Sequence, residues 1–186
     1  KPMVVAIDSG GHHTSEVYQY ARERQSLGVV AIKGMSTKNK PPIGKASKVD
    51  LNASGKTLKK GAQVFPVGSD TIKSLLFGRL KHNDVGAGYL HFYPTVDKDY
   101  FEELTAEKQI LRYKNGFPER VWVKKSSARN EALDELVYAY AALNRVYQIK
   151  DRRTLWDQIE RTPEERKESK RAVSAKRTQK SFVNQW

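Results

Sequence analysis

An apolar run that ends in an acid and two glycines, Val4-Val5-Ala6-Ile7-Asp8-Ser9-Gly10-Gly11, decides the fold of this chain. The run predicts a buried strand over residues 3–8. A carboxylate at the tip of such a strand is costly unless a positive group meets it there. A divalent cation is a common reason to keep a carboxylate in that position. We therefore expect Asp8 to be a metal ligand.

The chain after this strand alternates between helical and strand patterns. A helix is predicted over 14–24 and a second buried strand over 29–32, a spacing that favours a parallel pair with a right-handed crossover. Further strands are predicted at 64–67, 89–93 and 121–123, and further helices at 72–80, from Asp97 or Asp99 to Leu111, and from Ser127 to about Gln148. Strands that alternate with helices predict an α/β layered fold.

The stretch from Lys33 to Gly61 breaks the pattern, and we expect a long irregular loop there. It contains eight lysines and one acid. Lysines in such numbers favour contacts with a phosphate backbone, and a solvated loop is the alternative. The predicted DNA-binding residues are Lys33, Lys38, Lys40, Lys45, Lys48, Lys56, Lys59 and Lys60.

The composition narrows the classes of partner. The net charge is +13, from 34 Lys and Arg against 21 Asp and Glu. This favours a polyanion such as nucleic acid, although a solubility surface or a basic tail is the alternative. The chain has no cysteine, which excludes disulfides and thiol metal sites. No apolar run is long enough to cross a bilayer, so we expect no membrane partner.

A second acidic cluster, Glu131, Asp134 and Glu135, opens the predicted final helix. Glu131 and Asp134 are three residues apart and share a face, and Asp134 borders the apolar stripe. Early acids also suit the positive end of a helix dipole, which is the favoured explanation for Glu131 or Glu135 alone. Cleavage of a phosphodiester by two metals requires several carboxylates around ions about 4 Å apart. Asp8 together with Asp134 therefore predicts a Mg²⁺ or Mn²⁺ site.

Other possible motifs are weaker. His12 and His13 could bind phosphate, transfer a proton or join a metal site, but a solvated loop is the more frequent outcome. Gly55-Lys56-Thr57 resembles the end of a phosphate-binding loop, yet Asp50 stands where that motif requires glycine. We therefore predict no ATPase site in this chain.

Several motifs occur in a fixed order along residues 3–146. They are Ala6-Ile7-Asp8-Ser9-Gly10-Gly11, Val30-Ala31-Ile32-Lys33-Gly34, Val67-Gly68-Ser69-Asp70-Thr71-Ile72-Lys73, Gly88-Tyr89-Leu90-His91-Phe92, Leu104-Thr105-Ala106-Glu107-Lys108 and Arg129-Asn130-Glu131-Ala132-Leu133-Asp134. This ordered set resembles the large terminase subunit of lambda-like tailed bacteriophages.

The resemblance implies an RNase H-like nuclease domain, an α/β fold with a mixed sheet flanked by helices. Such a domain cuts concatemeric double-stranded DNA during packaging by two-metal hydrolysis. Asp8 and Asp134 match acids that bind the catalytic Mg²⁺ or Mn²⁺ in the family, and Glu131 belongs to the same motif as Asp134. The implied partners are double-stranded DNA, the small terminase subunit and the capsid portal, in the host cytoplasm.

The chain departs from the family pattern in one respect. The family's first metal-binding aspartate lies on an earlier strand, before a β-meander that this sequence does not contain, and the ATPase motor domain is also missing. We therefore expect the C-terminal portion of a larger protein or a truncated prophage-type product, with the sheet lacking its first strands. The expected parts are a nuclease domain over 1–149 and a basic tail over 150–186 that is helix-prone or disordered. Two alternatives remain, a non-catalytic DNA-binding or motor-docking fragment and another RNase H-like nuclease such as a resolvase.

Overall fold

The computed structural model describes residues 2–35, 37–53, 55–161 and 165. The chain divides into two compact units, with the boundary after Val146. The strands are β1 (Val5–Asp8), β2 (Val29–Met35), β3 (Ser47–Ala53), β4 (Lys56–Gly68), β5 (Glu107–Lys114) and β6 (Phe117–Lys124). The helices are α1 (Thr14–Glu23), the short 3₁₀ helix η1 (Gln25–Leu27), α2 (Ser69–Arg79), α3 (Lys98–Leu104), α4 (Glu131–Ile149) and α5 (Arg152–Glu160).

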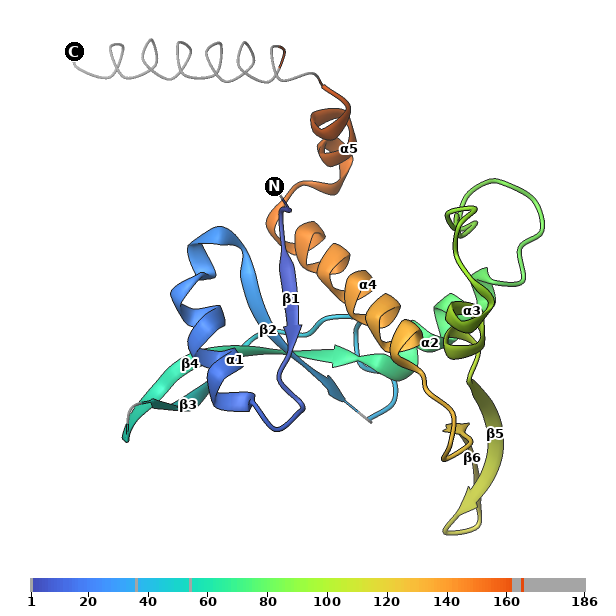
Figure 1. Cartoon of the computed structure of the whole chain (residues 1–186), viewed down its shortest axis with the longest axis horizontal. Coiled ribbons are helices and arrows are strands. Elements are labelled where there is room, and N and C mark those ends of the chain that lie inside the picture. The colour runs from blue at the N-terminus through green and yellow to red at the C-terminus, as the bar shows by residue number, and fades with distance from the viewer. Residues whose placement is uncertain (1, 36, 54, 162–164, 166–186) are drawn as a thin grey trace. The chain divides into compact units, whose positions relative to one another are not determined.

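The first four strands form a mixed sheet in the order β1-β2-β4-β3 (Figure 1). β1 pairs with β2 in parallel, so that Asp8 lies opposite Ile32, and β2 pairs with β4 in parallel. β3 runs antiparallel to β4. The predicted parallel pair with a helical crossover is therefore confirmed, with α1 as the crossover helix. β1 itself lies at the edge of the sheet, and its apolar residues are only partly buried, unlike those of β2.

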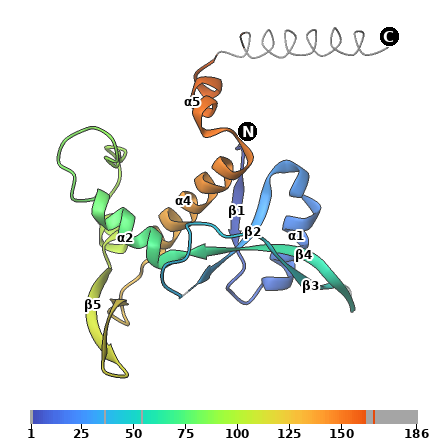
Figure 2. The same cartoon turned by 180° about the vertical axis from the view of Figure 1, so that it is seen from behind.

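Helices cover both faces of this sheet because the side chains of a strand alternate between its faces. Val29 and Ala31 of β2 pack with Ala21 of α1 in a small cluster. Ile32, on the other face of the same strand, belongs to the larger core. That core brings together residues of β4, α2, α3 and α4, among them Phe65, Val67, Ile72, Leu76, Leu104, Leu133 and Val137. The prediction of an α/β fold with a mixed sheet flanked by helices is thus confirmed (Figure 2).

The prediction of one long irregular loop from Lys33 to Gly61 is wrong, because the stretch contains regular strands. Strand β3 and the first part of β4 lie there and pair with each other as a hairpin. A bulge interrupts the pairing at Asp50, whose Oδ1 accepts a hydrogen bond from the backbone N–H of Lys60 at 2.8 Å. Lysine side chains hide the strand pattern in the sequence, while backbone hydrogen bonds to a neighbouring strand stabilise the extended chain.

The helix predicted to reach Leu111 ends at Leu104 instead. Asp97 caps its start, as predicted, by accepting a hydrogen bond from the N–H of Tyr100 at 2.9 Å. The following residues form the β5–β6 hairpin, which is a separate two-stranded sheet. Its turn residues, Asn115 and Gly116, both have positive φ (52° and 81°), the conformation that a two-residue hairpin turn requires.

One further predicted element is absent, and the final helix is present but begins later than predicted. The segment predicted as a strand at 89–93 has no strand pairing, and its Phe92 instead packs edge-on against Phe101, with ring centroids 5.1 Å apart. The final helix begins at Glu131 and not near Ser127. The side chain of Glu103 accepts a hydrogen bond from the N–H of Ala132 at 3.3 Å, so a distant acid stabilises the start of α4.

The second unit contains α5, which Asp151 caps by accepting a hydrogen bond from the N–H of Arg153 at 3.0 Å. The rest of the tail predicted over 150–186 lies outside the described residues after Arg161, apart from Glu165. In the described part of the chain, no helix has the length and apolar character that crossing a membrane would require.

Candidate active site

Asp8 lies at the end of β1, where the sheet fixes its backbone. The next residue, Ser9, is buried, and its hydroxyl donates to the carbonyl of Ile32 at 2.8 Å. The N–H of Gly10 donates to Asp8 Oδ1 at 3.0 Å. A Cβ atom at Gly10 would lie 3.3 Å from that oxygen, so glycine leaves the room that this turn needs. The carboxylate is therefore held in place and still exposed at the sheet edge.

Helix α4 brings a second acid towards Asp8. Asp134 and Tyr138 are four residues apart and share one face of the helix. The Tyr138 side chain lies near Asp8, close enough for the Asp8 charge to act on its hydroxyl. Burial raises the pKa of Tyr138 well above its usual range, and the negative charges of Asp8 and Asp134 raise it further. Tyr138 therefore stays protonated, and its hydroxyl is a donor that lies near Asp8.

Asp134 is half-buried within a group of charged and polar side chains. Burial raises the pKa of its carboxyl group, and the charges of Glu107 and Asp8 act in the same direction. The ammonium group of Lys73 opposes them, with Nζ 3.5 Å from Asp134 Oδ1. Asn130 Nδ2 donates to the other oxygen, Oδ2, at 3.0 Å. Asp8 and Asp134 are thus close enough to interact although they lie near opposite ends of the first unit's sequence.

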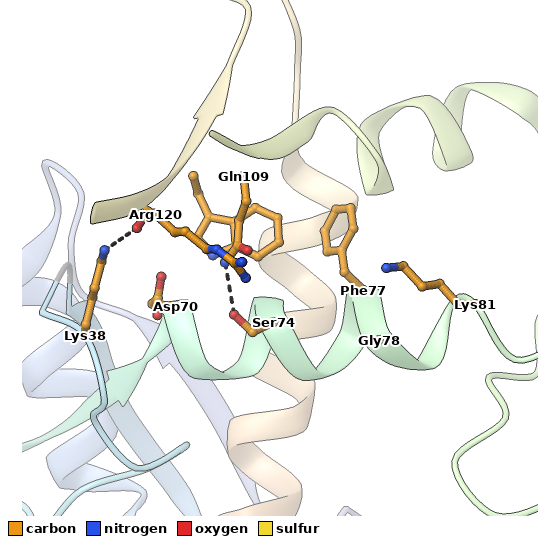
Figure 3. Close-up of a pocket in the computed structure, with 9 residues that line it drawn as sticks. Lys38, Asp70, Ser74, Phe77, Gly78, Lys81, Gln109 and Arg120 are labelled. Atoms are coloured by element: carbon orange, nitrogen blue, oxygen red, sulfur yellow. Dashed lines mark hydrogen bonds between the residues drawn. The ribbon is translucent and has the colours of Figure 1, made fainter. Parts of the chain in front are cut away.

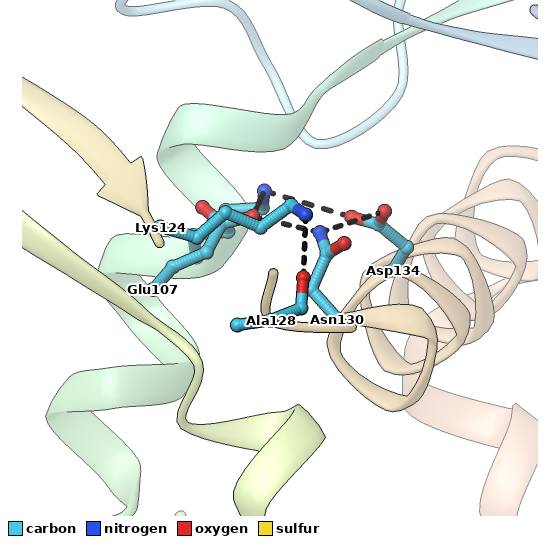
Figure 4. A network of polar contacts seen from close by, with 6 residues as sticks. Glu107, Lys124, Ala128, Asn130 and Asp134 are labelled. Carbon is cyan, nitrogen blue, oxygen red and sulfur yellow. Dashed lines mark hydrogen bonds and ion pairs between the residues drawn. The ribbon is translucent and has the colours of Figure 1, made fainter. Parts of the chain in front are cut away.

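Glu107 holds the two partners of Asp134 in position. Its side chain is only 8% exposed. Its Oε1 accepts from Lys73 Nζ at 2.7 Å and from Asn130 Nδ2 at 2.9 Å. Figure 4 shows the Asn130 amide between Glu107 and Asp134. A buried carboxylate with a cation and an amide donor is satisfied, and removing the Lys73 cation would leave its charge uncompensated.

The structure places Glu131 differently from Asp134. Its side chain is 57% exposed, and Oε2 lies 3.3 Å from Nε of Arg129, which also pairs with Glu103 at 3.2 Å. A backbone hydrogen bond at the helix start holds the pKa of Glu131 below its ordinary value, and Arg129 adds to this effect. These contacts support a role at the start of α4, and metal binding by Glu131 stays a prediction.

The donor set matches part of a metal site. Asp8 and Asp134 offer the hard carboxylate oxygens that Mg²⁺ and Mn²⁺ prefer. Among the residues that the structure describes, no group of three or more His, Asp or Glu side chains is arranged to hold a metal ion. His13 does not join the two acids, because its ring is 84% exposed and lies 3.9 Å from Glu16. In the part of the chain that the structure describes, Asp8 and Asp134 are therefore the candidate ligands that lie together.

Comparison with known families fits this geometry. A family model described as "Terminase large subunit gpA, endonuclease domain" matches residues 1–156. The chain belongs to this family. It is 32% identical over 148 residues to the terminase large subunit of Enterobacteria phage P21 and 32% identical over 146 residues to that of Escherichia phage lambda.

These matches cover 75% of the chain but only 22% and 21% of the two relatives, so the chain spans about a fifth of their length. No solved structure matches it. The resemblance to the large terminase subunit that the ordered motifs predict is thereby confirmed.

Four residues that surround the two acids in this terminase endonuclease domain were not predicted from the sequence as part of the site. They are Lys73, Glu107, Asn130 and Tyr138. Helical spacing from Asp134 could have identified Asn130 and Tyr138, which lie four residues before and after it. Lys73 and Glu107 gave no such signal, because their contacts depend on how α2 and the unpredicted hairpin pack.

The predicted DNA-binding lysines of the domain fall into two groups. Lys38 pairs with Glu119 of β6 at 3.1 Å and donates to the backbone carbonyl of Arg120, so it joins its loop to the hairpin. The other seven are exposed: Lys33, Lys40, Lys45, Lys48, Lys56, Lys59 and Lys60. The exposed set is available to a phosphate backbone, and its contact with DNA stays a prediction.

Proposed function

We propose that this chain is the catalytic region of a Mg²⁺- or Mn²⁺-dependent endonuclease that cuts concatemeric double-stranded DNA during phage DNA packaging. The observation that carries the proposal is the convergence of Asp8 and Asp134 around the Tyr138 hydroxyl. The family membership and the two terminase large subunits support it. The same proposal places the protein in the host cytoplasm, with DNA, the small terminase subunit and the capsid portal as partners.

In this mechanism, Asp8 and Asp134 hold the metal. A metal held there would supply activation of the attacking water and stabilisation of the leaving oxygen. Tyr138 lies near Asp8 and orients it by donating its hydroxyl when the metal is bound, and Asn130 orients Asp134 by its hydrogen bond to Oδ2. Lys73 favours the charged form of Asp134, the form that binds a cation. Outer hydrogen bonds of this kind commonly tune metal affinity by 10–100-fold.

We further propose that the domain is RNase H-like and that another strand, carrying a third acid, pairs with β1. β1 is an edge strand whose apolar residues are only partly buried. Beside it lies an open groove of about 560 Å³, lined by residues 3–6 and by Glu135, Tyr138, Ala139, Ala142, Leu143 and Val146 of α4. An added strand would cover this apolar groove and satisfy the free edge. A longer chain that supplies such a strand should accordingly bind Mn²⁺ more tightly than residues 1–186, and equal affinities would contradict this part of the proposal.

Cleavage of plasmid DNA with Mg²⁺ or Mn²⁺ tests the activity directly. Asp8→Asn and Asp134→Asn should each abolish cutting, because each removes a charged ligand. Asp99→Asn, at an exposed acid in the first turn of α3, is the matched control and should cut normally. Undiminished cutting by both site variants would show that the assignment is wrong.

One observation favours a second function, a non-catalytic DNA-binding or motor-docking fragment. Within the described residues, no group of three metal-binding side chains is present. This alternative predicts DNA binding that weakens with salt and no cleavage with any divalent metal. The plasmid assay therefore separates the two functions.

A further inference from the structure

A polar cleft lies between α2 and the β5–β6 hairpin (Figure 3). Its volume is about 460 Å³, within the usual range of ligand sites. We call it the α2–β6 cleft. Its lining includes Lys38, Asp70, Ser74, Lys81, Arg120 and Trp122.

The cleft is cationic. Lys38, Lys81 and Arg120 line it against one acid, Asp70. Lys38 is already paired with Glu119. No ion pair is found for the Arg120 or Lys81 side chain within the described ranges of the chain, so both charges are available to an anion.

The wall of the cleft also contains an unused hydrogen-bond donor. Trp122 packs its ring against Phe77, with centroids 4.8 Å apart. Its indole Nε1 is buried and has no acceptor among the described residues. An indole N–H can only donate, and buried donors are normally paired.

The cleft adjoins the acid site through two shared elements. On α2, Ser74 of the cleft follows Lys73 of the acid site. On β5, Gln109 of the cleft lies two residues after Glu107, a separation of about 7 Å along a strand. Gln109 Nε2 donates to Ser74 Oγ at 3.3 Å, which joins the two elements. A strand of DNA bound at the acids would therefore reach the cleft within a few nucleotides.

The cations also follow a line. Figure 3 shows Lys38 beside the start of α2 and Lys81 beyond its end, with Arg120 between them. The eleven-residue step from Asp70 to Lys81 corresponds to roughly 16 Å along a helix, or several phosphates at about 3.4 Å per nucleotide of one strand. A linear polyanion matches this spacing better than a single phosphate ion does.

The hairpin face that continues from the cleft suits the same ligand. Arg120 lies opposite Leu111 in the pairing of β5 with β6, and Tyr113 follows on the same face. The Tyr113 residue is 72% exposed and Leu111 is 56% exposed. Apolar and aromatic side chains beside cations are typical of surfaces that contact sugars and bases next to phosphates.

We propose that the α2–β6 cleft binds the phosphodiester backbone of the DNA strand that is cut, a few nucleotides from the scissile phosphate. The proposal rests on the DNA endonuclease function above and assigns it a binding site apart from the acids. Arg120 and Lys81 bind the phosphate oxygens.

DNA binding by the full chain in metal-free buffer tests this site without any cleavage. Arg120→Gln and Lys81→Gln should each weaken binding of a fluorescent duplex about tenfold and lower the slope of log affinity against log salt by about one. Arg22→Gln, an exposed arginine on α1, is the matched control and should leave both quantities unchanged. Cleft variants that bind like this control would overturn the proposal.

Neutral methylphosphonate groups at single positions of the duplex locate the contact. Wild-type chain should lose affinity at one position a few nucleotides from the cut, and Arg120→Gln should be insensitive to that change. If Arg120→Gln lowers the affinity for inorganic phosphate but not for DNA, the cleft is a phosphate site and the proposal is overturned. If wild-type chain does not cut DNA but Arg120→Gln still weakens DNA binding, only the proposed nuclease function is contradicted. If wild-type chain cuts DNA but Arg120→Gln binds DNA normally, only the proposed DNA contact at the cleft is contradicted.

Discussion

Tyr138 is the residue that connects the two candidate metal ligands. It lies one helical turn after Asp134, and its hydroxyl is close enough to both Asp8 and Asp134 for their charges to raise its pKa. Its raised pKa means that the hydroxyl remains a donor throughout the range in which carboxylates ionise. The position of the Asp8 carboxylate thus depends on a donor that keeps its proton while the acids around it titrate.

Tyr138→Phe tests this role, because it keeps the ring and removes the donor. We expect Mn²⁺ affinity to fall about tenfold, within the range for outer hydrogen bonds, and the free energy of unfolding to fall by about 1 kcal/mol. Calorimetric titration and urea unfolding measure the two quantities. Tyr20→Phe on α1 is the control, and an unchanged Mn²⁺ affinity in Tyr138→Phe would contradict the role.

The raised pKa of Asp134 predicts that the free energy of unfolding depends on pH. Because burial raises its pKa in the folded chain, its contribution to stability is fully present below the pKa of the unfolded chain and is lost as pH rises through the folded pKa. Asp134→Asn should therefore be more stable than wild type at neutral pH without metal, with a gap that narrows in acid. Urea unfolding across this range checks the trend, and a gap that widens in acid would contradict it.

Sequence alone identifies the two candidate ligands but not their surroundings. Asp8 stands out because it ends an apolar strand, and Asp134 because it borders an apolar stripe. Lys73 and Glu107 could not be found this way, because a buried ion pair between α2 and β5 depends on packing over long sequence separations. For Glu131, sequence reasoning suggested a contact that the structure does not have. Helical spacing groups Glu131 with Asp134, but its side chain pairs with Arg129.

At the scale of elements, the junction of β4 and α2 positions Lys73. A Cβ atom at Gly68 would lie 2.4 Å from the carbonyl oxygen of Lys40 and 2.5 Å from that of Pro41. Both are backbone atoms, so the chain would have to move. Gly68→Ala should lower the free energy of unfolding by about 2 kcal/mol or more.

Gly78→Ala is the matched control for that substitution. Gly78 lies within α2, and a Cβ atom there would have no atom within 4 Å. Alanine is the better helix former, so this variant should be more stable by up to about 1 kcal/mol. Urea unfolding of both variants checks the contrast, and similar destabilisation by both would contradict the close approach at Gly68.

The elements that sequence analysis missed share a physical reason. β3 and the start of β4 carry exposed lysines in place of alternating apolar residues, so only their pairing shows them as strands. The β5–β6 hairpin could not be predicted from the apolar pattern, because Ile110 and Leu111 continue the helical spacing of α3. Its Asn115-Gly116 turn was the one local signal that could have revealed it.

At the scale of the whole molecule, the net charge of +13 predicts that the chain binds DNA mainly through contacts between its cations and the phosphates. Replacing Lys56, Lys59 and Lys60 of β4 with glutamine should weaken duplex binding and lower the salt slope by about one for each phosphate that is no longer neutralised. Fluorescence anisotropy over a range of salt concentrations measures this. Lys98→Gln on α3 is the control, and an unchanged slope in the triple variant would show that the β3–β4 hairpin does not contact DNA.

The central claim is that Asp8 and Asp134 bind one metal site, and a crystal structure with Mn²⁺, located by its anomalous scattering, tests it most directly. We predict a Mn²⁺ ion with oxygens of both carboxylates at about 2.0–2.6 Å. Carboxylates more than about 8 Å apart, or an ion bound only by other residues, would contradict the account.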